Sequence, residues 1–478
     1  MSIFKNTVAN MAGAVIPLAI SILTVPLYLK FIGEERYGVL AVIWVLLGYF
    51  GVFDLGLGKA TTQRMAKIDS ASERSELLLT VLILTIFMGA LGGLVLLFSS
   101  DWILANLFTL DEASKHEALA STIWLPVGLV LLLLNSAMKG ALQARERFVA
   151  INSASVLGDS MSQMLPLVVA WFGYVTIDLL LPAVLAARLL TTVLLFMQCY
   201  KYVPLSKGAK INLAHVKPLL NYGGWACTVT MIGPLMVVLE RLVIASIAGA
   251  KGVTYFTVPF NLVTKLSILP NSYGGVLFPK LASLPADESK ALADQAARNT
   301  VALMTPLVII TLGLVHPFLI LWLGADLAER CAGVGELILF GVWISALVVP
   351  HSYLLYAEGL LKTKILAVTL LEVPLYIFML WFGVKYFGVL GAAGAWSLRV
   401  LIDAILFLIL ARALREMVLF ALSSIFLVAV TTVVVLFFDV HVLWRWVAIL
   451  ILVLFSVGIH WKLCIGAYRS LTSRVSTV

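Results

Sequence analysis

Long apolar runs alternate with short polar segments along nearly the whole chain. A helix of about 20 apolar residues spans the hydrocarbon core of a bilayer. Runs of about this length occupy residues 8–31, 37–58, 77–98, 118–138, 151–173, 177–199, 219–247, 253–277, 299–321, 332–356, 365–383, 388–410, 417–438 and 444–463. Glycines and prolines interrupt the first, second and eighth runs. The pattern predicts an all-α polytopic membrane protein of about 14 transmembrane helices.

Composition leaves little room for a domain outside the membrane. Of the 478 residues, 62% are hydrophobic and 12% are charged, whereas soluble proteins carry about 25% charged residues. This balance excludes a soluble enzyme. Because the first run is longer than the apolar part of a signal peptide, we expect it to remain in the protein as the first helix.

Basic residues fall mostly on one side of the predicted membrane. With Lys5 placed in the cytoplasm, 22 Lys and Arg lie on the cytoplasmic side and 7 on the outer side. Cytoplasmic loops are enriched in Lys and Arg, so the split predicts cytoplasmic N and C termini and an even number of spans. The net charge of +8 therefore reflects membrane topology, and we expect no nucleic-acid partner.

Three segments of the first half of the chain have counterparts in the second half, in the same order and at nearly the same separation in sequence. FIGEERYGVLAVIW matches IAGAKGVTYFTVPF at an offset near 216, and ALQARERF matches EGLLKTKI at an offset near 217. AARLLTTVLLF matches SLRVLIDAILF at an offset of 211, which aligns Arg188 with Arg399. An offset of six helices, an even number, keeps both halves in the same orientation in the membrane.

The repeat predicts two pseudo-symmetric six-helix lobes followed by two further helices. We expect an N-lobe at 1–205, a C-lobe at 206–416, and helices 13 and 14 with a cytoplasmic tail at 417–478. Two parallel-repeat lobes are typical of alternating-access transporters, in which the substrate passes between the lobes.

Four basic residues inside predicted helices are the candidate substrate-binding residues: Arg188, Lys265, Arg399 and Arg241. A Lys or Arg at a helix centre costs about 2.5–3.5 kcal/mol, so each needs a partner or a function. Arg188 and Lys265 have no acidic residue three or four positions away. We expect these cations to face a water-filled cavity and to bind an anionic substrate, since arginine matches phosphate oxygens well.

Two of the four basic residues have a structural alternative within their own helix. Arg399 and Asp403 are four positions apart on one helix face and could neutralise each other. Glu240 and Arg241 are adjacent and diverge by about 100°, so we expect that they cannot pair within the helix. Arg241 could instead extend to the membrane surface.

Acidic residues inside the predicted helices are candidates for ion coupling: Asp54, Asp159, Glu372 and Asp403. A carboxylate removed from water readily takes up a cation, so the coupling ion would be a proton or sodium. Asp54 lies near the cytoplasmic end of its helix and could simply be hydrated. Asp159 or Glu372 could instead pair with Lys265 across helices.

Sequence motifs for catalysis are absent from the chain. It contains no GxxxxGK[ST], HExxH or GxSxG, and its six histidines are dispersed. We therefore expect no ATP hydrolysis, no metal site and no enzyme activity. Beyond a coupling ion and the membrane potential, no cofactor is expected.

Loose glycine, proline and aromatic motifs carry a resemblance over essentially the full length. These are NTVANMAG, PLYLKFIGEERYGVLAV and FDLGLGKATTQRMAK in the first half, and YFTVPFNLV, LPNSYGGVLFPKLASL and YFGVLGAAGAWSLRV in the second. With them the chain resembles the multidrug/oligosaccharidyl-lipid/polysaccharide (MOP) exporter superfamily, and within it the polysaccharide-unit flippases of the O-antigen group.

This resemblance implies a substrate and a route. The substrate would be an undecaprenyl-pyrophosphate-linked oligosaccharide, an O-antigen or related surface polysaccharide unit. It would move from the cytoplasmic to the periplasmic leaflet of a bacterial inner membrane, through a cationic cavity between the lobes. Membrane lipids would surround the protein, and a polysaccharide polymerase with chain-length machinery would be its partners in lipopolysaccharide assembly.

Three other functions fit the sequence less well. A lipid-linked peptidoglycan-precursor flippase would carry charges in the first helix, and residues 8–29 contain none. An ion-coupled multidrug antiporter of the same superfamily would favour acidic and aromatic cavity walls over central cations. A membrane polysaccharide polymerase or ligase needs a sizeable outer loop, and the longest predicted here, 99–117, has no catalytic constellation.

Overall fold

The structure is a computed structural model that describes residues 3–106, 112–203, 210–220, 232–357, 364–437 and 443–459. Within these ranges the chain forms α-helices and short 3-10 helices and no β-strand. Seven of the described helices are long and apolar enough to cross a membrane, and α15 (Leu443–Ile459) is apolar but shorter. The all-α, polytopic class predicted from the sequence is therefore confirmed.

The chain divides into two compact units, unit 1 at Met1–Thr254 and unit 2 at Tyr255–Val478. The division falls inside one long helix, α9 (Ile232–Val263). The first part of α9 belongs to unit 1, where the Thr254 hydroxyl donates to the Glu34 carbonyl over 2.6 Å.

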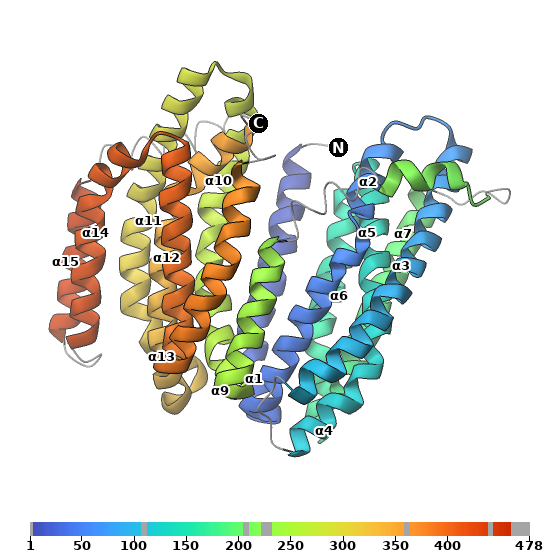
Figure 1. Cartoon of the computed structure of the whole chain (residues 1–478), viewed down its shortest axis with the longest axis horizontal. Helices are drawn as coiled ribbons and strands as arrows, with labels where there is room; N and C mark the ends of the chain where they lie inside the picture. The colour runs from blue at the N-terminus through green and yellow to red at the C-terminus, as the bar shows by residue number, and fades with distance from the viewer. Residues whose placement is uncertain are drawn as a thin grey trace. The chain divides into compact units, whose positions relative to one another are not determined.

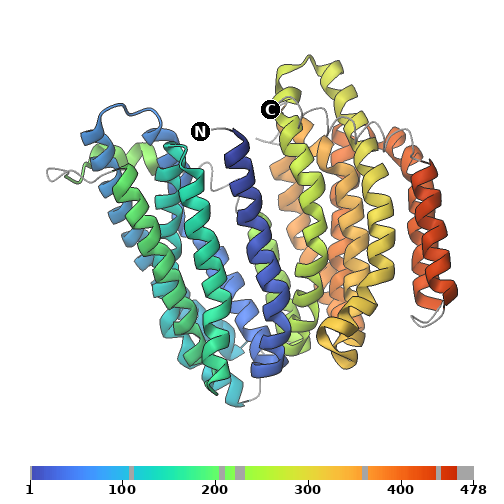
Figure 2. The ribbon, with the colours of Figure 1, turned by 180° about the vertical axis from the view of Figure 1, so that it is seen from behind.

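Unit 1 is a bundle of long helices with short helical segments at their ends. Its elements are α1 (Ile3–Phe50), η1 (Gly51–Asp54), α2 (Leu57–Met65), α3 (Ala71–Asn106), α4 (Glu112–Ser121), η2 (Thr122–Trp124), α5 (Leu125–Ala144), α6 (Phe148–Trp171), α7 (Ile177–Tyr202) and η3 (Leu213–His215). Helix α6 packs against α1 and α7, and α5 packs against α3 and α7, as Figure 1 and Figure 2 show from opposite sides.

Unit 2 is a second bundle of long helices and ends in two helices that follow the predicted repeat. After the end of α9 come η4 (Thr264–Ser267), α10 (Ile268–Ser283), α11 (Ala286–Leu323), α12 (Ala325–Ala357), α13 (Lys364–Leu410), α14 (Leu414–Phe437) and α15. Helix α12 packs against α10, α11 and α13. The added helices α14 and α15 pack against each other and against α11, and lie at one edge of the unit (Figure 1).

Glycines with positive φ angles bend the chain at repeated positions. Gly33 in α1 (φ 81°) and Gly249 in α9 (φ 72°) are 216 residues apart. Gly173 between α6 and α7 (φ 91°) and Gly388 in α13 (φ 59°) are 215 residues apart. Glycine adopts this conformation without the steric penalty that a Cβ brings. Both spacings match the predicted repeat offset.

A 3-10 segment interrupts the second helical stretch of each repeat. In unit 1 it is η1, followed by α2, and in unit 2 it is η4, followed by α10. A short stretch of 3-10 geometry inside a long helix often marks a functional hinge. The glycines and prolines noted in these two apolar runs are the sequence signal for the interruption.

Residues 210–220, which follow α7 in the chain, dock on unit 1. The Asn212 N–H donates to the Thr80 hydroxyl over 3.0 Å, and the Arg64 guanidinium donates to His215 Nδ1 over 3.3 Å. Leu219 is buried in an apolar cluster with residues of α2, α3, α5 and α7. This segment is therefore held by both polar and apolar contacts.

Large apolar side chains cover much of the outside of both units. Phe98, Trp171 and Phe172 in unit 1 and Leu321 and Trp444 in unit 2 are among the most exposed. In water such surfaces would be unfavourable, whereas lipid chains solvate them.

Candidate functional site

Helix α13 bends at Gly388, and the two arms on either side of this bend bring a group of charged residues together in unit 2. Glu372 and Tyr376 lie on the first arm, and Arg399 and Asp403 on the second, at nearly equal distances along the chain from the bend at Gly388. The arms approach closely because two glycines meet. A Cβ atom on Gly391 would overlap the Gly383 carbonyl, and the reverse substitution is also crowded.

We refer to Glu372, Tyr376, Arg399 and Asp403 as the α13 cluster. Arg399 Nη1 lies 3.4 Å from Asp403 Oδ2, and its guanidinium lies 5.3 Å from the centre of the Tyr376 ring. Glu372 is buried and interacts electrostatically with both Asp403 and Arg399. Two carboxylates facing one guanidinium leave a net charge of −1, which suits one bound proton or monovalent cation.

The sequence left open whether Arg399 pairs with Asp403 within its own helix. The i, i+4 pair of Arg399 and Asp403 is present. Three of the four members of the α13 cluster were predicted from the sequence. Arg399 was a candidate for substrate binding, and Glu372 and Asp403 were candidates for ion coupling. The structure brings them together. A role of Arg399 in substrate binding stays a prediction.

Lys265 lies in η4, and its side chain is exposed. It forms no ion pair with Glu372 or with any other acidic residue in the described part of unit 2. The ion pair between Lys265 and Glu372, one alternative to substrate binding by Lys265, is therefore absent. An exposed ammonium group at a 3-10 interruption is available to an anion.

Arg188 lies on α7, half-buried against neighbouring helices. Its Nε is shielded from solvent and has no hydrogen-bond partner, and no ion pair to it occurs among the residues that the structure describes. Asp159 on the packed helix α6 interacts with it electrostatically but is itself exposed. The role of Arg188 in substrate binding stays a prediction.

Asp54 closes η1 and caps the following helix. Its Oδ2 accepts the Gly58 N–H over 3.3 Å and the Ser136 hydroxyl over 3.0 Å. Its Oδ1 is shielded from solvent without a hydrogen-bond partner. The carboxylate is thus held by α2 and α5. The alternative from the sequence, in which Asp54 is simply hydrated, is therefore wrong.

The expectation for Arg241 was wrong. Its Nη1 forms an ion pair with Oε1 of the adjacent Glu240, and both residues are buried in unit 1. Adjacent side chains do leave a helix about 100° apart, yet long arginine and glutamate chains can bend together. Burial drives them to do so, because an unpaired charge away from water is costly. Arg241 also does not extend to the membrane surface. Its predicted role in substrate binding stays a prediction.

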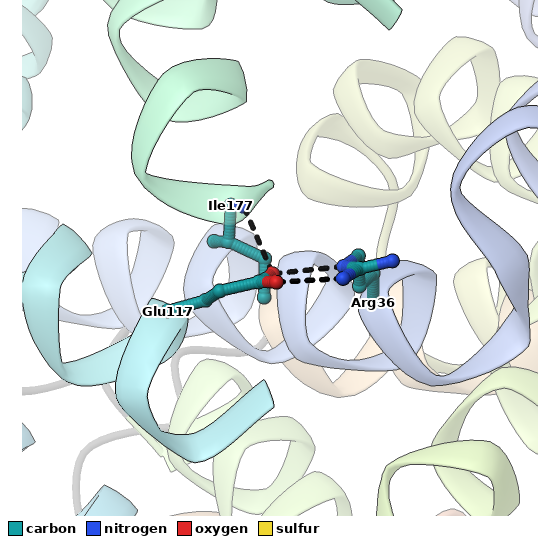
Figure 3. A network of polar contacts seen from close by, with 3 residues as sticks. All are labelled: Arg36, Glu117 and Ile177. Atoms are coloured by element: carbon teal, nitrogen blue, oxygen red, sulfur yellow. Dashed lines mark hydrogen bonds and ion pairs between the residues drawn. The ribbon is translucent and has the colours of Figure 1, made fainter. Parts of the chain in front are cut away.

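A second ion pair in unit 1 was not anticipated. Arg36, just after the bend in α1, donates from Nε and Nη2 to both oxygens of Glu117 on α4, over 2.8 and 2.6 Å. Figure 3 shows the two groups facing each other, with the Ile177 N–H at the start of α7 donating to the same carboxylate over 3.4 Å. The contact ties three elements at one end of unit 1.

Arg445 was also missed, because the charge count placed it in an outer loop. It lies in α15 and is 2% exposed, with Nη2 3.5 Å from the Gly313 carbonyl on α11. Glu336 on α12 interacts with it electrostatically. Its position inside the apolar run 444–463 was the signal that could have identified it.

Comparison with solved structures identifies the fold. A multidrug resistance MATE family transporter of the MOP superfamily, in an inward-facing conformation, matches with a TM-score of 0.70 at 14% identity, over 87% of this chain and 98% of that one. The lipid II flippase MurJ, in an inward closed conformation, matches with a TM-score of 0.71 at 14% identity, over 96% and 99%. The fold is that of the MOP superfamily transporters.

The sequence comparisons identify the family. The family described as "Polysaccharide biosynthesis protein" matches residues 3–285, more than half of the chain. A "Putative O-antigen transporter" of Shigella flexneri is 27% identical over 412 residues, 85% of this chain and 97% of that protein. The chain belongs to the polysaccharide biosynthesis protein family. Its long apolar helices make it a multi-pass inner-membrane protein, and the relatives that it matches are named as transporters and flippases.

Proposed function

We propose that this protein is a flippase for undecaprenyl-pyrophosphate-linked oligosaccharide units of O-antigen or a related surface polysaccharide. It moves the polar part of the substrate from the cytoplasmic to the periplasmic leaflet by alternating access, while the prenyl chain stays in lipid. The observation that carries the proposal is the match to the Shigella flexneri protein named "Putative O-antigen transporter", over 97% of that protein. The lipid II flippase fold also supports a lipid-linked glycan as the substrate class.

Two of the four candidate basic residues, Arg188 and Lys265, supply the chemistry of this proposal. Arg188 in unit 1 and Lys265 in unit 2 have no carboxylate partner among the residues described in their own units. A lipid diphosphate carries several acceptor oxygens, and guanidinium and ammonium groups bind such oxygens by charge-assisted hydrogen bonds. We assign the diphosphate, the part common to all such substrates, to these residues.

The energy for net export comes from an ion and from the membrane potential. Moving two negative charges outward is favoured by about 2.3 kcal/mol per charge per 100 mV when the cell interior is negative. We propose that the α13 cluster binds the coupling ion, a proton or sodium, between Glu372 and Asp403. Asp54 and Asp159 remain proposed as further coupling residues.

The membrane topology proposed for this function has 14 spans with both termini in the cytoplasm. The lobes extend over 1–205 and 206–416, and residues 417–478 form the last two spans and a tail. Polysaccharide polymerase and chain-length proteins would receive the product on the periplasmic side.

Complementation of a flippase-deletion strain tests the proposal. We expect wild type to restore surface polysaccharide, and Arg188→Gln or Lys265→Gln to restore less than a tenth as much at equal expression, because losing a hydrogen bond to a charged group costs about 1.5–3 kcal/mol. Arg330→Gln is the matched control, because Arg330 is an exposed residue paired with Asp326. If wild type exports cationic drugs and restores no polysaccharide, the proposal is wrong.

A further inference from the structure

Two basic side chains from different helices of unit 1 converge on one tyrosine ring. The Arg147 guanidinium lies 4.5 Å from the centre of the Tyr202 ring, and Lys201 Nζ lies 5.4 Å from it. Arg147 directly precedes α6, and Lys201 and Tyr202 are the last two residues of α7. These helices pack against each other, so the start of one meets the end of the other. We refer to the three residues as the basic cluster.

The fold holds both the ring and the arginine backbone of the basic cluster in place. Tyr202 is half-buried and packs against an apolar cluster of unit 1 that includes Cys199. The Arg147 N–H donates to the Leu142 carbonyl over 3.0 Å, and the Arg147 carbonyl accepts from the Ile151 N–H over 3.1 Å. The cluster is therefore built from fixed parts of two helices.

The two charges of the basic cluster are not neutralised by an acid. Arg147 and Lys201 are exposed, and no ion pair joins either of them to a residue that the structure describes, the adjacent Glu146 included. A cation over an exposed ring gains only about 0.5–1 kcal/mol. A guanidinium also keeps N–H donors at its edge that can bind acceptor oxygens. The cluster therefore favours a bound anion.

An exposed apolar stripe on α7 leads to the basic cluster. Its members recur every three or four positions, and all are exposed: Leu189, Val193, Phe196, Met197 and Tyr200. Residues at this spacing lie on one face of a helix. Lys201 follows Met197 by four positions, so it continues this face at the end of α7. In a membrane the stripe contacts acyl chains, and the cluster lies at the interface, where tyrosine and basic side chains are favoured.

These features together fit an anionic phospholipid of the surrounding membrane. Its phosphate accepts charge-assisted hydrogen bonds from both cations, while an acyl chain covers the stripe on α7. A soluble anion would use the two cations and leave the stripe uncovered. A zwitterionic lipid such as phosphatidylethanolamine would bring a third positive charge next to the cluster. Charge and apolar surface therefore select the same class of ligand.

We propose that Arg147, Lys201 and Tyr202 bind the head group of an anionic glycerophospholipid at the predicted cytoplasmic surface, with an acyl chain along α7. The bound lipid links the start of α6 to the end of α7. This site is separate from the candidate residues for substrate and ion binding. It does not rest on the proposed transport function, because it requires only a membrane around the protein.

Native mass spectrometry of the full-length protein in detergent tests the site by titration with dioleoyl phosphatidylglycerol and, separately, dioleoyl phosphatidylethanolamine. We expect the Arg147→Gln/Lys201→Gln double variant to bind phosphatidylglycerol at least tenfold more weakly than wild type, since each basic residue near anionic lipid contributes about fivefold. Phosphatidylethanolamine should bind weakly and equally to both proteins. Arg145→Gln is the matched control, because Arg145 is exposed at the same turn and lies outside the basic cluster.

Substitution of the ring separates a built site from general surface charge. Tyr202→Phe keeps the ring and should bind phosphatidylglycerol as wild type does. Tyr202→Leu keeps both charges and an apolar side chain, and we expect a two- to fivefold loss of affinity, equivalent to about 0.5–1 kcal/mol. Thermal unfolding of each variant confirms that it is folded.

Three results would overturn the proposal. The first is equal affinity for phosphatidylglycerol in wild type and the double variant. The second is an equal loss in the double variant and Arg145→Gln, which would mean that only surface charge matters. The third comes from titration with undecaprenyl diphosphate. If the double variant loses binding of this lipid and keeps that of phosphatidylglycerol, the basic cluster belongs to the lipid-linked substrate.

Discussion

The last helical pair of each repeat carries the same two charges in different surroundings. Asp159 on α6 and Glu372 on α13 are 213 residues apart, and Arg188 on α7 and Arg399 on α13 are 211 apart. Each unit therefore places one acid and one arginine on two antiparallel helices joined at a positive-φ glycine. In unit 2 the arginine is paired, and in unit 1 no ion pair to it is found within the described residues.

One residue accounts for the difference. Four positions after Arg399 stands Asp403, whereas four positions after Arg188 stands Thr192, whose hydroxyl donates to the Arg188 carbonyl over 2.9 Å. A residue at i+4 lies over the same helix face, so Asp403 can neutralise its arginine and Thr192 cannot. The backbone is repeated while its charges diverge. We infer that unit 1 presents a free cation to an anionic substrate, and unit 2 keeps an acidic cluster for an ion.

Transferring the acid to unit 1 should have the largest effect. In Thr192→Asp the new carboxylate would pair with Arg188 and occupy its donors. We expect translocation in proteoliposomes to fall about 10- to 100-fold, because a hydrogen bond to a charged group is worth about 1.5–3 kcal/mol. Thr192→Asn, similar in size and uncharged, should retain activity. Equal loss in both variants would mean that the charge at position 192 has no effect, which would contradict the assigned role of Arg188.

Removing the acid from unit 2 should have a smaller and different effect. In Asp403→Asn, the α13 cluster loses one of its two carboxylates, so Glu372 and Arg399 leave it neutral and it no longer attracts a cation. We expect the response of translocation to an imposed pH or sodium gradient to be lost, with about a tenfold lower rate under that gradient, equivalent to about 1.4 kcal/mol. Downhill translocation without a gradient should change less. An unchanged gradient response would remove the cluster from coupling.

Sequence reasoning succeeded where a pattern stays within one helix or repeats along the chain. The apolar runs, the repeat offset and the Arg399–Asp403 pair are of this kind. It missed contacts between distant segments, such as Arg36 with Glu117 and His351 with Asp294, because tertiary packing alone brings them together. It also misjudged Glu240 and Arg241, since burial changed which side-chain conformations were favourable.

The repeated bends should respond alike to substitution. Gly33 and Gly249 combine a positive φ with a ψ near 180°, a conformation that is essentially restricted to glycine. Gly33→Ala and Gly249→Ala should each cost about 1–3 kcal/mol, and we expect similar losses of thermal stability. Gly275→Ala is the control, because Gly275 lies in α10 with open space around it and the substitution should stabilise the helix by about 0.5–1 kcal/mol. A loss at one bend only would show that the two positions are not equivalent.

Two ion pairs in predicted outer segments allow a further comparison of the units, with the smallest expected effects on stability. In unit 1 the bidentate Arg36–Glu117 pair is partly buried, whereas in unit 2 the Arg330–Asp326 pair is exposed. We expect Glu117→Gln to cost about 1 kcal/mol of stability and Asp326→Asn close to none, measured by thermal unfolding in the same detergent. Equal effects would mean that the buried pair contributes no more than a surface pair.

Binding of the lipid diphosphate to the purified protein tests the central claim most directly. Native mass spectrometry can compare an undecaprenyl-diphosphate glycan with the matching monophosphate in wild type, Arg188→Lys and Arg188→Gln. The account predicts that wild type prefers the diphosphate, that Arg188→Lys keeps part of this preference, and that Arg188→Gln loses it. An equal preference for the diphosphate in all three proteins would contradict the assignment of the substrate diphosphate to Arg188.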